Sequence, residues 1–412
     1  MTARTLEGVK SIESFELEDK RVFLRLDLNV PLNDKGEVTD DTRLRAAMPT
    51  IQYAIEKGAK IVLASHLGRP KGGAQDRVKY TLEPVANYLN EKLGKEVILI
   101  EEPRSHAPKA LLAGLKPSQI ILLENLRFDP GEEKNDREFA QCLASYTDIY
   151  INDAFGASHR AHASIVALPE LVERKGMGFL MRKEIEMLDR IRLHPDSPFV
   201  TVLGGAKVSD KIEIIEVLID RVDTLIIGGA MAYTFLAAQG VPTGKSLVEK
   251  DKVKFAADLM ARAHARNKRL LLPVDHRITV NISETQSLKT TDTAAIPEGW
   301  MGIDIGPRTL AIYAAEVKSA KTIFWNGPMG VFETPEFALG TFGVAKAIVE
   351  SAALSVVGGG DSAAAAHASG VADRFSHIST GGGASLEFLQ GDKLPGVEAL
   401  RPPKRSEVSA EG

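Results

Sequence analysis

Short runs of almost uninterrupted apolar residues alternate along the whole chain with amphipathic stretches of helical period. A strand that is apolar on both faces is buried on both, as strands of a parallel sheet are, and the amphipathic stretches supply the covering helices. The expected strands are 22–26, 60–64, 97–100, 120–123, 149–152, 199–203, 224–227, 269–273, 322–325, 355–357 and 376–379. The expected helices include 42–57, 82–93, 211–221 and 252–265. The pattern predicts an α/β fold made of repeated βα units.

The chain has 412 residues, about twice the length of a common domain, so we expect two domains. A helical stretch at 183–193 precedes Pro195 and Pro198, and proline disfavours helix at the residue before it. We predict two doubly wound parallel-sheet (Rossmann-like) domains, each with three αβα layers, joined by this connecting helix. The boundaries are 1–182 for the N-terminal domain, 183–194 for the interdomain helix or hinge, 195–390 for the C-terminal domain and 391–412 for a polar tail. A single barrel of eight βα units is the alternative, which the uneven strand spacing and the mid-chain helix disfavour.

Composition excludes several classes of partner. The net charge of −4 gives no argument for binding nucleic acid or a membrane surface. The single cysteine, Cys142, excludes a disulfide within the chain and fits a reducing compartment. No apolar run reaches the ~18 residues that a membrane-spanning helix needs, and the N-terminus lacks the apolar segment of a signal peptide. We therefore expect a cytoplasmic protein with neither nucleic acid nor membrane as a partner.

Basic and polar side chains follow several predicted strands of the first half, and Arg43 opens the helix after the first loop. Ligands of open parallel sheets bind at the carboxyl ends of the strands, so these side chains are expected to share one cleft. Guanidinium groups grip phosphate and carboxylate, while carboxylates and amides bond hydroxyl groups. An arginine taken alone is more often part of a surface ion pair, but together these arginines predict a small, highly anionic, hydroxylated substrate. The candidates are Asp27, Leu28, Asn29, Arg43, His66, Leu67, Gly68, Arg69, Arg127 and Arg160, with His159 and His162 beside them.

Three glycine-rich turns at 204–207, 358–362 and 380–383 dominate the second half. Each follows an apolar run and precedes a predicted helix. Bare backbone N–H groups at a helix N-terminus bind anions, so the turns predict phosphate sites. This half is therefore expected to hold a different anionic ligand from the first.

Charged residues accompany these turns. Lys207 and Lys211 are four apart where the first turn enters its helix, so we expect both on one face at its N-terminal end. Asp361 in the second turn either caps its helix or holds magnesium, a cation that prefers carboxylate and phosphate oxygens. Phosphate sites on both sides favour magnesium.

Two common nucleotide signatures are missing from the sequence. Residues 240–246, Gly-Val-Pro-Thr-Gly-Lys-Ser, are one residue short of a Walker A loop and follow a helix rather than a strand. No Gly-x-Gly-x-x-Gly follows the first predicted strand of either half. A dinucleotide-dependent dehydrogenase with the same sheet architecture is therefore disfavoured.

These residues closely resemble the phosphoglycerate kinase family. The motifs run in family order over almost the whole chain, with small departures at Leu26, Leu28 and Ser362 and a polar extension after Leu400. Substrate-side matches are Arg-Leu-Asp-Leu-Asn-Val-Pro at 25–31, His-Leu-Gly-Arg-Pro at 66–70, Leu-Glu-Asn-Leu-Arg-Phe at 123–128, Gly-Glu-Glu at 131–133, Asn-Asp-Ala-Phe-Gly at 152–156 and His-Arg-Ala-His at 159–162. Nucleotide-side matches are Gly-Gly-Ala-Lys-Val-Ser-Asp-Lys at 204–211, Trp-Asn-Gly-Pro-Met-Gly-Val-Phe-Glu at 325–333, Gly-Gly-Gly-Asp-Ser at 358–362 and Ser-Thr-Gly-Gly-Gly-Ala-Ser-Leu-Glu at 379–387.

The resemblance implies reversible, Mg²⁺-dependent phosphoryl transfer between 1,3-bisphosphoglycerate and ADP, giving 3-phosphoglycerate and ATP. It further implies a monomeric glycolytic enzyme whose tail returns toward the N-terminal domain. The implied 3-phosphoglycerate residues are Asp27, Leu28, Asn29, Arg43, His66, Leu67, Gly68, Arg69, Arg127 and Arg160. The implied nucleotide residues are Lys211, Gly302, Glu333, Gly359, Gly360, Asp361 and Ser362, with Glu333 on the ribose and Asp361 on Mg²⁺. The implied catalytic residues are Arg43, Lys207, Lys211, Gly360 and Gly383.

The residue types suit this chemistry. The attacking atom is already an anionic oxygen of a phosphate or a carboxylate, so no general base is required. Catalysis is then expected to depend on positioning and charge stabilisation, with hinge closure at 183–194 excluding water. An inactive metabolite- or nucleotide-binding homologue is the alternative, which loss of Arg43, Lys211 or Asp361 would signal. All three residues are present.

Overall fold

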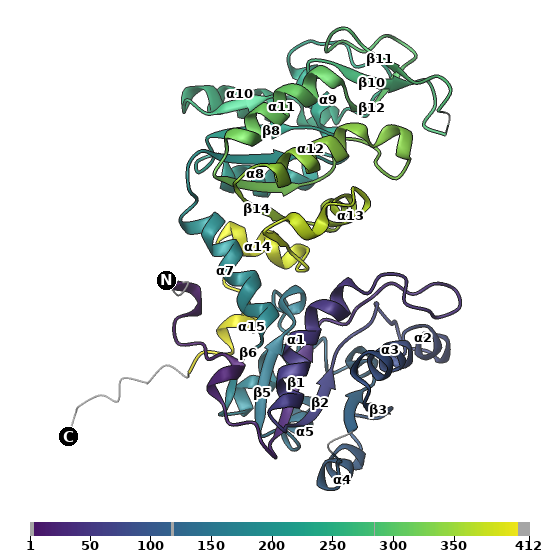
Figure 1. Ribbon diagram of the computed structural model, residues 1–412, viewed down its shortest axis with the longest axis vertical. Coiled ribbons are helices and arrows are strands. Elements are labelled where there is room, and N and C mark those ends of the chain that lie inside the picture. Colours follow the sequence, from purple (N-terminus) through teal and green to yellow (C-terminus); the bar gives the residue numbers. More distant parts are fainter. Residues whose placement is uncertain (1–3, 117–118, 284, 403–412) are drawn as a thin grey trace, which may run out of the picture. The chain divides into compact units, whose positions relative to one another are not determined.

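Two parallel β-sheets organise the chain, as the apolar runs predict (Figure 1). The computed structural model describes residues 4–116, 119–283 and 285–402. Its contacts divide the chain into unit 1, Met1–Glu186 with Lys393–Gly412, and unit 2, Met187–Asp392. Each unit contains one six-stranded sheet within its described residues. The predicted fold class, two doubly wound α/β units, is confirmed.

The sheet of unit 1 has the strand order β3-β4-β2-β1-β5-β6, and all its strands are parallel. Strands β2, β3 and β4 all lie on one side of β1, and the chain then crosses to the other side of β1 to form β5. This reversal creates a switch point beside β1, where ligands of such sheets bind. The strands are β1 (Arg21–Leu26), β2 (Lys60–Ala64), β3 (Glu96–Ile100), β4 (Gln119–Leu123), β5 (Ile149–Asp153) and β6 (Lys175–Met177). Strand β6 was not predicted, because Lys-Gly-Met contains no apolar run.

Both faces of this sheet are buried. Val22, Leu24 and Leu26 of β1 belong to one core cluster with buried residues of α1 and α3. Phe23, between them, faces the opposite side and stacks on Tyr150 of β5 with ring centroids 6.0 Å apart. The continuous apolar pattern of β1 therefore has the physical cause assumed for it. The helices of unit 1 are α1 (Thr42–Glu56), α2 (Ala74–Lys79), α3 (Glu83–Leu93), α4 (Ala107–Ala113), α5 (Arg137–Ala144), α6 (Leu168–Leu171) and α15 (Pro395–Glu398), and α7 (Phe179–Leu193) continues from unit 1 into unit 2.

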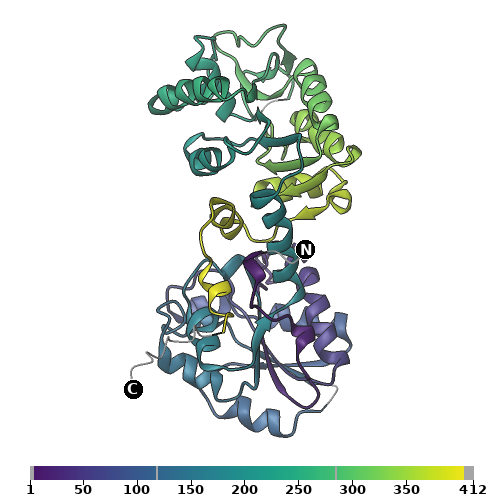
Figure 2. The same ribbon diagram turned by 90° about the vertical axis from the view of Figure 1, so that its left-hand side faces the viewer.

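The C-terminal segment packs against unit 1. Gly396 N–H donates to the Ser158 carbonyl at 2.9 Å, beside the end of β5. Arg401 donates to the Glu7 carbonyl at 2.5 Å and to the Thr5 carbonyl at 2.8 Å. Figure 2 shows α15, in yellow, among the strands and loops of this unit. Residues 403–412 of the predicted tail lie outside the described residues.

The sheet of unit 2 has the strand order β15-β14-β13-β7-β8-β9, again all parallel. The chain builds outward from β7 through β8 and β9, and then crosses to β13, so the switch point lies between β7 and β13. The strands are β7 (Phe199–Leu203), β8 (Thr224–Ile227), β9 (Arg269–Leu271), β13 (Thr322–Asn326), β14 (Leu354–Val357) and β15 (His377–Ile378). The helices are α8 (Ile212–Leu218), α9 (Met231–Ala238), α10 (Val253–Ala265), α11 (Pro307–Ser319), α12 (Leu339–Glu350), α13 (Gly360–Ala368) and α14 (Gly383–Gln390). No helix in the described ranges is long and apolar enough to cross a membrane.

Unit 2 also carries a small antiparallel sheet that the sequence did not predict. It has the order β11-β10-β12, with β10 (His276–Thr279), β11 (Lys289–Thr290) and β12 (Met301–Ile305). These strands contain two to five residues and mix polar with apolar side chains. Because the prediction relied on longer apolar runs, it could not detect them. The sheet matters for the site because β12 contains Gly302.

Gly340 at the start of α12 provides a test of the unit 2 core. A Cβ there would overlap Asp304 Oδ1 and Ile305 Cγ1 of β12. Ala normally stabilises a helix relative to Gly by about 0.5–1 kcal/mol, but overpacking a core costs about 1–3 kcal/mol. We therefore expect Gly340→Ala to lower the urea midpoint of unfolding. As a control, Gly114→Ala, which meets no heavy atom within 4 Å, should leave it nearly unchanged. Equal midpoints for both variants would contradict this packing.

Candidate functional site

The loops after β1 and β2 hold the predicted polar residues of unit 1 together. Arg43, in the first turn of α1, donates from Nη1 to both carboxylate oxygens of Asp27, at 2.7 and 2.8 Å. Asn29 Oδ1 accepts a hydrogen bond from Gly68 N–H at 2.8 Å. Leu28 N–H donates to Ser65 Oγ at 2.9 Å. The side chains that follow the two strands are therefore fixed relative to each other.

The loop after β4 joins the same edge. Arg127 donates from Nη1 to the Gly68 carbonyl at 2.6 Å, and its Nε lies 3.2 Å from Glu133 Oε1. Asn125 Nδ2 donates to the carbonyl of the buried Leu67 at 2.7 Å. A cavity of about 750 Å³ borders this edge, with Asn29, Leu67 and Gly68 in its lining. The predicted loops therefore meet beside an open volume.

Six basic side chains form what we call the cationic cluster: Arg25, Arg43, His66, Arg127, Arg160 and His162. Burial lowers the pKa of His66 well below its usual value, and the charges of Arg25, Arg127 and Arg43 lower it further. Burial and the same kinds of neighbours lower the pKa of His162 to about 3. Both imidazoles are therefore neutral at neutral pH. The arrangement favours binding of an anion, which would offset the repulsion among the guanidinium groups.

Two further predicted residues of unit 1 lie toward the solvent. Arg160, half-buried, donates from Nε to His159 Nε2 at 3.1 Å. Arg69 is exposed on the loop that also carries His66 and Gly68. Together with the residues above, they complete the set that the sequence assigned to the strand ends of this unit.

In unit 2, glycines allow the ends of β7 and β13 to meet at the switch point. Gly204 N–H donates to the Asn326 carbonyl at 3.0 Å, and Gly205 N–H donates to the Pro328 carbonyl at 2.9 Å. A Cβ at Gly204 would overlap the Pro328 carbonyl oxygen. Gly327 has a φ of 107°, and a Cβ there would overlap the backbone of Gly204. The first glycine-rich turn therefore needs glycine for a close approach of two backbones.

Hydrogen bonds connect the first turn to the second. Lys211 Nζ donates to Asn326 Oδ1, and Asn326 Nδ2 donates to the Gly358 carbonyl at 2.6 Å. Gly327 N–H donates to Ser362 Oγ at 2.5 Å. Burial lowers the pKa of Lys211, whereas the nearby Asp361 carboxylate raises it. A lysine and a carboxylate are thus brought to the same edge, as the sequence predicted.

The local structure around Lys211 and around Asp361 differs from the prediction. Lys207 lies exposed in the turn, and Lys211 ends a 3-10 segment, Ser209–Lys211, that precedes α8. The expected pair on one face of the α-helix is therefore wrong, because the chain tightens into a 3-10 turn before the α-helix begins. Asp361 is exposed in the first turn of α13, whose N-cap residue is Gly359. The carboxylate is therefore not the N-cap of that helix.

The remaining predicted residues of unit 2 lie in three other elements. Gly383 is the first residue of α14, directly after the third glycine-rich turn. Gly302 in β12 donates its N–H to Ser246 Oγ at 2.9 Å. Glu333 is exposed in the turn after β13, and this turn is joined to β12 because Val331 N–H donates to the Ile303 carbonyl at 2.8 Å. The segments that contain Gly302 and Glu333 therefore lie side by side.

Several residues that organise the two edges were not singled out by the sequence. Asn326 joins Lys211 to Gly358. Its place as a polar residue at the end of an apolar strand was the signal that could have identified it. Glu132 and Ser164 form a buried hydrogen-bond pair beneath the cationic cluster. Glu132 belongs to the Gly-Glu-Glu match at 131–133, but its bond to Ser164 spans 32 residues and could not be predicted from local sequence.

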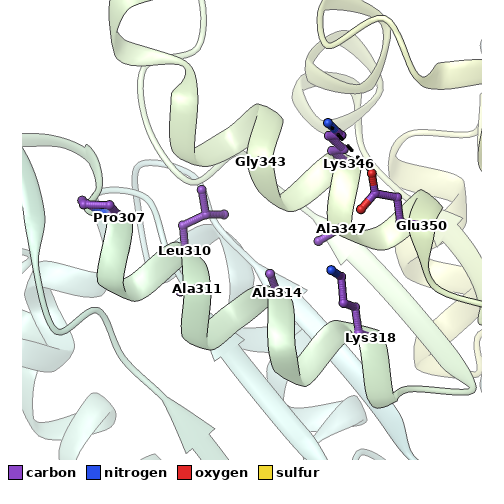
Figure 3. A pocket seen from close by; sticks show the side chains of 9 residues that line it. All are labelled: Pro307, Leu310, Ala311, Ala314, Lys318, Gly343, Lys346, Ala347 and Glu350. Carbon is purple, nitrogen blue, oxygen red and sulfur yellow. Dashed lines mark ion pairs between the residues drawn. The ribbon is translucent and has the colours of Figure 1, made fainter.

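A separate hollow of about 380 Å³ lies on the surface of unit 2 between α11 and α12. Figure 3 shows its apolar floor, with Lys346 and Glu350 forming an ion pair at 4.0 Å on the rim. None of the predicted site residues lines it. The candidate site is therefore at the strand ends and not in this hollow.

Comparisons with known proteins agree with the resemblance. The family model described as phosphoglycerate kinase matches residues 12–392. The phosphoglycerate kinase of Bdellovibrio bacteriovorus is 60% identical over 399 residues, which cover 97% of this chain and 99% of the relative. That of Anaeromyxobacter dehalogenans (strain 2CP-1) is 54% identical over 392 residues, 95% of this chain and 99% of the relative. The solved phosphoglycerate kinase of Coxiella burnetii superposes with a TM-score of 0.85 at 41% identity, covering 95% of this chain and 98% of that chain.

The cationic cluster predicts a specific response to divalent anions. Ligand at about ten times its Kd adds about 1.4 kcal/mol to stability, which raises Tm by about 3 °C. We expect sulfate to raise Tm more than chloride of equal ionic strength, and Arg127→Met to lose this difference. Arg45→Met is the control, since Arg45 has a 62% exposed side chain paired with Asp41 at 2.8 Å. An unchanged sulfate effect in Arg127→Met would contradict an anion site at the cluster.

Proposed function

We propose a mechanism for this chain, which belongs to the phosphoglycerate kinase family and is a phosphotransferase with phosphoglycerate kinase function. The transfer is direct and in line, between 1,3-bisphosphoglycerate and ADP in one direction and between ATP and 3-phosphoglycerate in the other. The observation that carries the mechanism is the contrast between the two sheet edges. One edge presents guanidinium and imidazole groups, and the other presents glycine amides and a lysine. An inactive homologue is not favoured.

The edge of unit 1 binds the glycerate substrate. Arg127 and Arg160 pair with its anionic groups, and Arg69, exposed on the neighbouring loop, adds a third guanidinium. Asp27 and Asn29 bond its hydroxyl group. The backbone from Leu28 and from Leu67 to Gly68 shapes the pocket, which the 2.8 Å bond between Asn29 and Gly68 holds in place.

The edge of unit 2 binds the nucleotide. The amides from Gly359 to Ser362 at the start of α13 hold phosphate oxygens, since a helix N-terminus offers free N–H groups. Lys211 pairs with the same phosphates. Gly302 lies beside the base, with the Tyr233 hydroxyl filling the place that a side chain at Gly302 would take, and Glu333 accepts from the ribose. The adjacency of β12 and the turn after β13 supports this placement of the last two residues.

Magnesium fits the donor set around Asp361. Mg²⁺ is held in such enzymes by one or two carboxylates, with substrate phosphates and water completing its shell. Asp361 is an exposed carboxylate beside Ser362 and near Lys211. The described residues contain no group of three or more His, Cys, Asp or Glu side chains that could hold a metal ion. When bound, the ion neutralises charge on the nucleotide phosphates.

The chain's own residues then stabilise the transferring group. Arg43, Lys207 and Lys211, with the amides of Gly360 and Gly383, place positive charge around the equatorial oxygens of the phosphoryl group. The nucleophile is already anionic, so no residue need remove a proton. We also propose that the two units close about α7 when both substrates are bound, which excludes water. The enzyme acts as a monomer in the cytoplasm.

Arg43→Ala tests the mechanism. Loss of an arginine that contacts mainly the transition state reduces the rate by about 10³–10⁵ in phosphoryl-transfer enzymes. We expect kcat to fall by that order, with a smaller change in KM for 3-phosphoglycerate. The rate is measured with 3-phosphoglycerate and MgATP, coupled to a reductase that consumes 1,3-bisphosphoglycerate.

Arg45→Ala is the matched control, because Arg45 lies two residues further along α1 and its exposed side chain pairs with Asp41. This variant should keep its activity. Near-normal turnover in Arg43→Ala would remove Arg43 from the mechanism. Absence of activity in the unaltered chain would refute the function itself.

Asp361→Asn tests the magnesium assignment. Removal of the carboxylate should raise the Mg²⁺ concentration for half-maximal activity by about tenfold or more, because even supporting residues of metal sites are worth that much. Asp373→Asn, which alters another exposed carboxylate of unit 2, should leave the Mg²⁺ dependence unchanged. If both variants behave alike, Asp361 does not hold the ion.

A further inference from the structure

A buried chain of hydrogen bonds leads from Glu132 to His66. Both oxygens of the Glu132 carboxylate accept from Ser164, Oε1 from Oγ at 2.6 Å and Oε2 from the backbone N–H at 2.9 Å. Ser164 Oγ in turn accepts from Arg25 Nε at 2.8 Å. Arg25 Nη2 lies 3.3 Å from His66 Nδ1. Arg25, Ser164 and Glu132 are all completely buried.

The direction of every bond in this chain is determined by the groups themselves. A guanidinium has only N–H donors and stays protonated, so Arg25 can only donate to His66. His66 Nδ1 must therefore carry a lone pair. A neutral imidazole with no proton on Nδ1 carries it on Nε2. Ser164 accepts one bond and donates one, which uses its hydroxyl hydrogen for Glu132.

We propose that Arg25, Ser164 and Glu132 are positioning residues that hold His66 in its Nε2–H tautomer, so that a neutral imidazole donates a hydrogen bond to an anionic oxygen of the glycerate substrate. The inference rests on the proposed function, and on the contact with 3-phosphoglycerate that the family resemblance implies for His66. The opposite tautomer would present the Nε2 lone pair to an anion and would repel it. Selection of the tautomer is therefore part of substrate recognition.

The surroundings of His66 explain why this side chain must bind the anionic oxygen through the N–H of one tautomer rather than through a positive charge. Burial and the facing groups Arg25, Arg127, Arg43 and His162 all lower the pKa of His66. The imidazole is neutral at neutral pH, and it can bind an anion only by donating its single N–H.

Glu132 completes the chain because it fixes Arg25. Its carboxylate lies 4.0 Å from Arg25 Nη2. A buried carboxylate and guanidinium are tolerated only when their remaining donors and acceptors are bonded, which Ser164 achieves. Ser164 lies in a π-helical turn, Ala163–Ala167, and such turns occur often at functional sites. Ala163 N–H also donates to the Glu132 carbonyl at 2.8 Å, which locks the turn onto Glu132.

Nitrogen NMR of the full chain labelled with ¹⁵N-histidine reads the tautomer directly. The His66 signals are assigned by their loss in His66→Ala. We expect a proton on Nε2 and none on Nδ1 in the unaltered protein. A protonated Nδ1 would overturn the inference. The tautomer itself is read in the unaltered protein, and His66→Ala is needed only for the assignment.

Ser164→Ala separates positioning from general stability. We expect a mixture of His66 tautomers and a higher KM for 3-phosphoglycerate, with KM for ATP unchanged. The rise is about twofold for an even mixture, because the apparent affinity falls with the competent fraction, and reaches about tenfold where the hydrogen bond to the charged group is almost wholly lost. Thr147→Val is the control, because Thr147 Oγ1 is buried in the same unit and donates to the Leu143 carbonyl at 2.8 Å. It should change neither the tautomer nor either KM.

The outcomes distinguish this inference from the proposed function. An unchanged tautomer and KM in Ser164→Ala would overturn the positioning chain, while a raised KM for 3-phosphoglycerate in His66→Ala would still support His66 as a contact. An unchanged KM in His66→Ala would remove that contact and the inference with it. The proposed function would still be tested separately, by the activity of the unaltered chain.

Discussion

The buried carboxylate of Glu132 is the interaction on which the cationic cluster depends. Burial raises the pKa of this carboxyl, while Arg25 and the hydrogen bonds from Ser164 lower it and favour the charged form. A buried charge without partners costs several kcal/mol, so the three groups are stable only together. Because Arg25 is held in this way, His66 has a fixed neighbour. The geometry of the glycerate site thus depends on buried residues that would not themselves touch the substrate.

The edges of the two large sheets are both suited to anionic ligands, but they use different chemical groups. In unit 1, side chains of α1 and of the loops after β2 and β4 carry the positive charge, and they meet because parallel strands all end at one edge. In unit 2, the backbones at Gly204 and Pro328 come so close that no side chain fits between them. The amides at the start of α13 then provide the donors, because those of Gly204 and Gly205 already donate to backbone carbonyls. Backbone amides suit the phosphate chain of a nucleotide, whereas guanidinium forks suit a small ligand with both phosphate and carboxylate.

The sequence predicted the parts of the structure that depend on neighbouring residues. The apolar runs located every strand of the two large sheets except β6 to within two residues at each end, because burial on both faces leaves a strong local pattern. Strands β10 to β12 were missed, because they are only two to five residues long and mix polar with apolar side chains. The bond from Lys211 to Asn326 spans 115 residues, and no local pattern could reveal it. The strand ends could be predicted, but the hydrogen bonds between them could not.

The repulsion among the basic groups of the cationic cluster indicates that the anion site is already formed in the free protein. Burial is the main cause that lowers the pKa of Arg127, and Arg160 and Arg25 lower it further, although Glu133 opposes the shift. Such crowding of like charges costs stability in the free protein. An arriving anion would offset this repulsion, and positive charges already gathered at the site suit catalysis by fixed charges. The neutral side chains of His66 and His162 add hydrogen-bond donors to the site, and because they carry no charge they do not increase the repulsion.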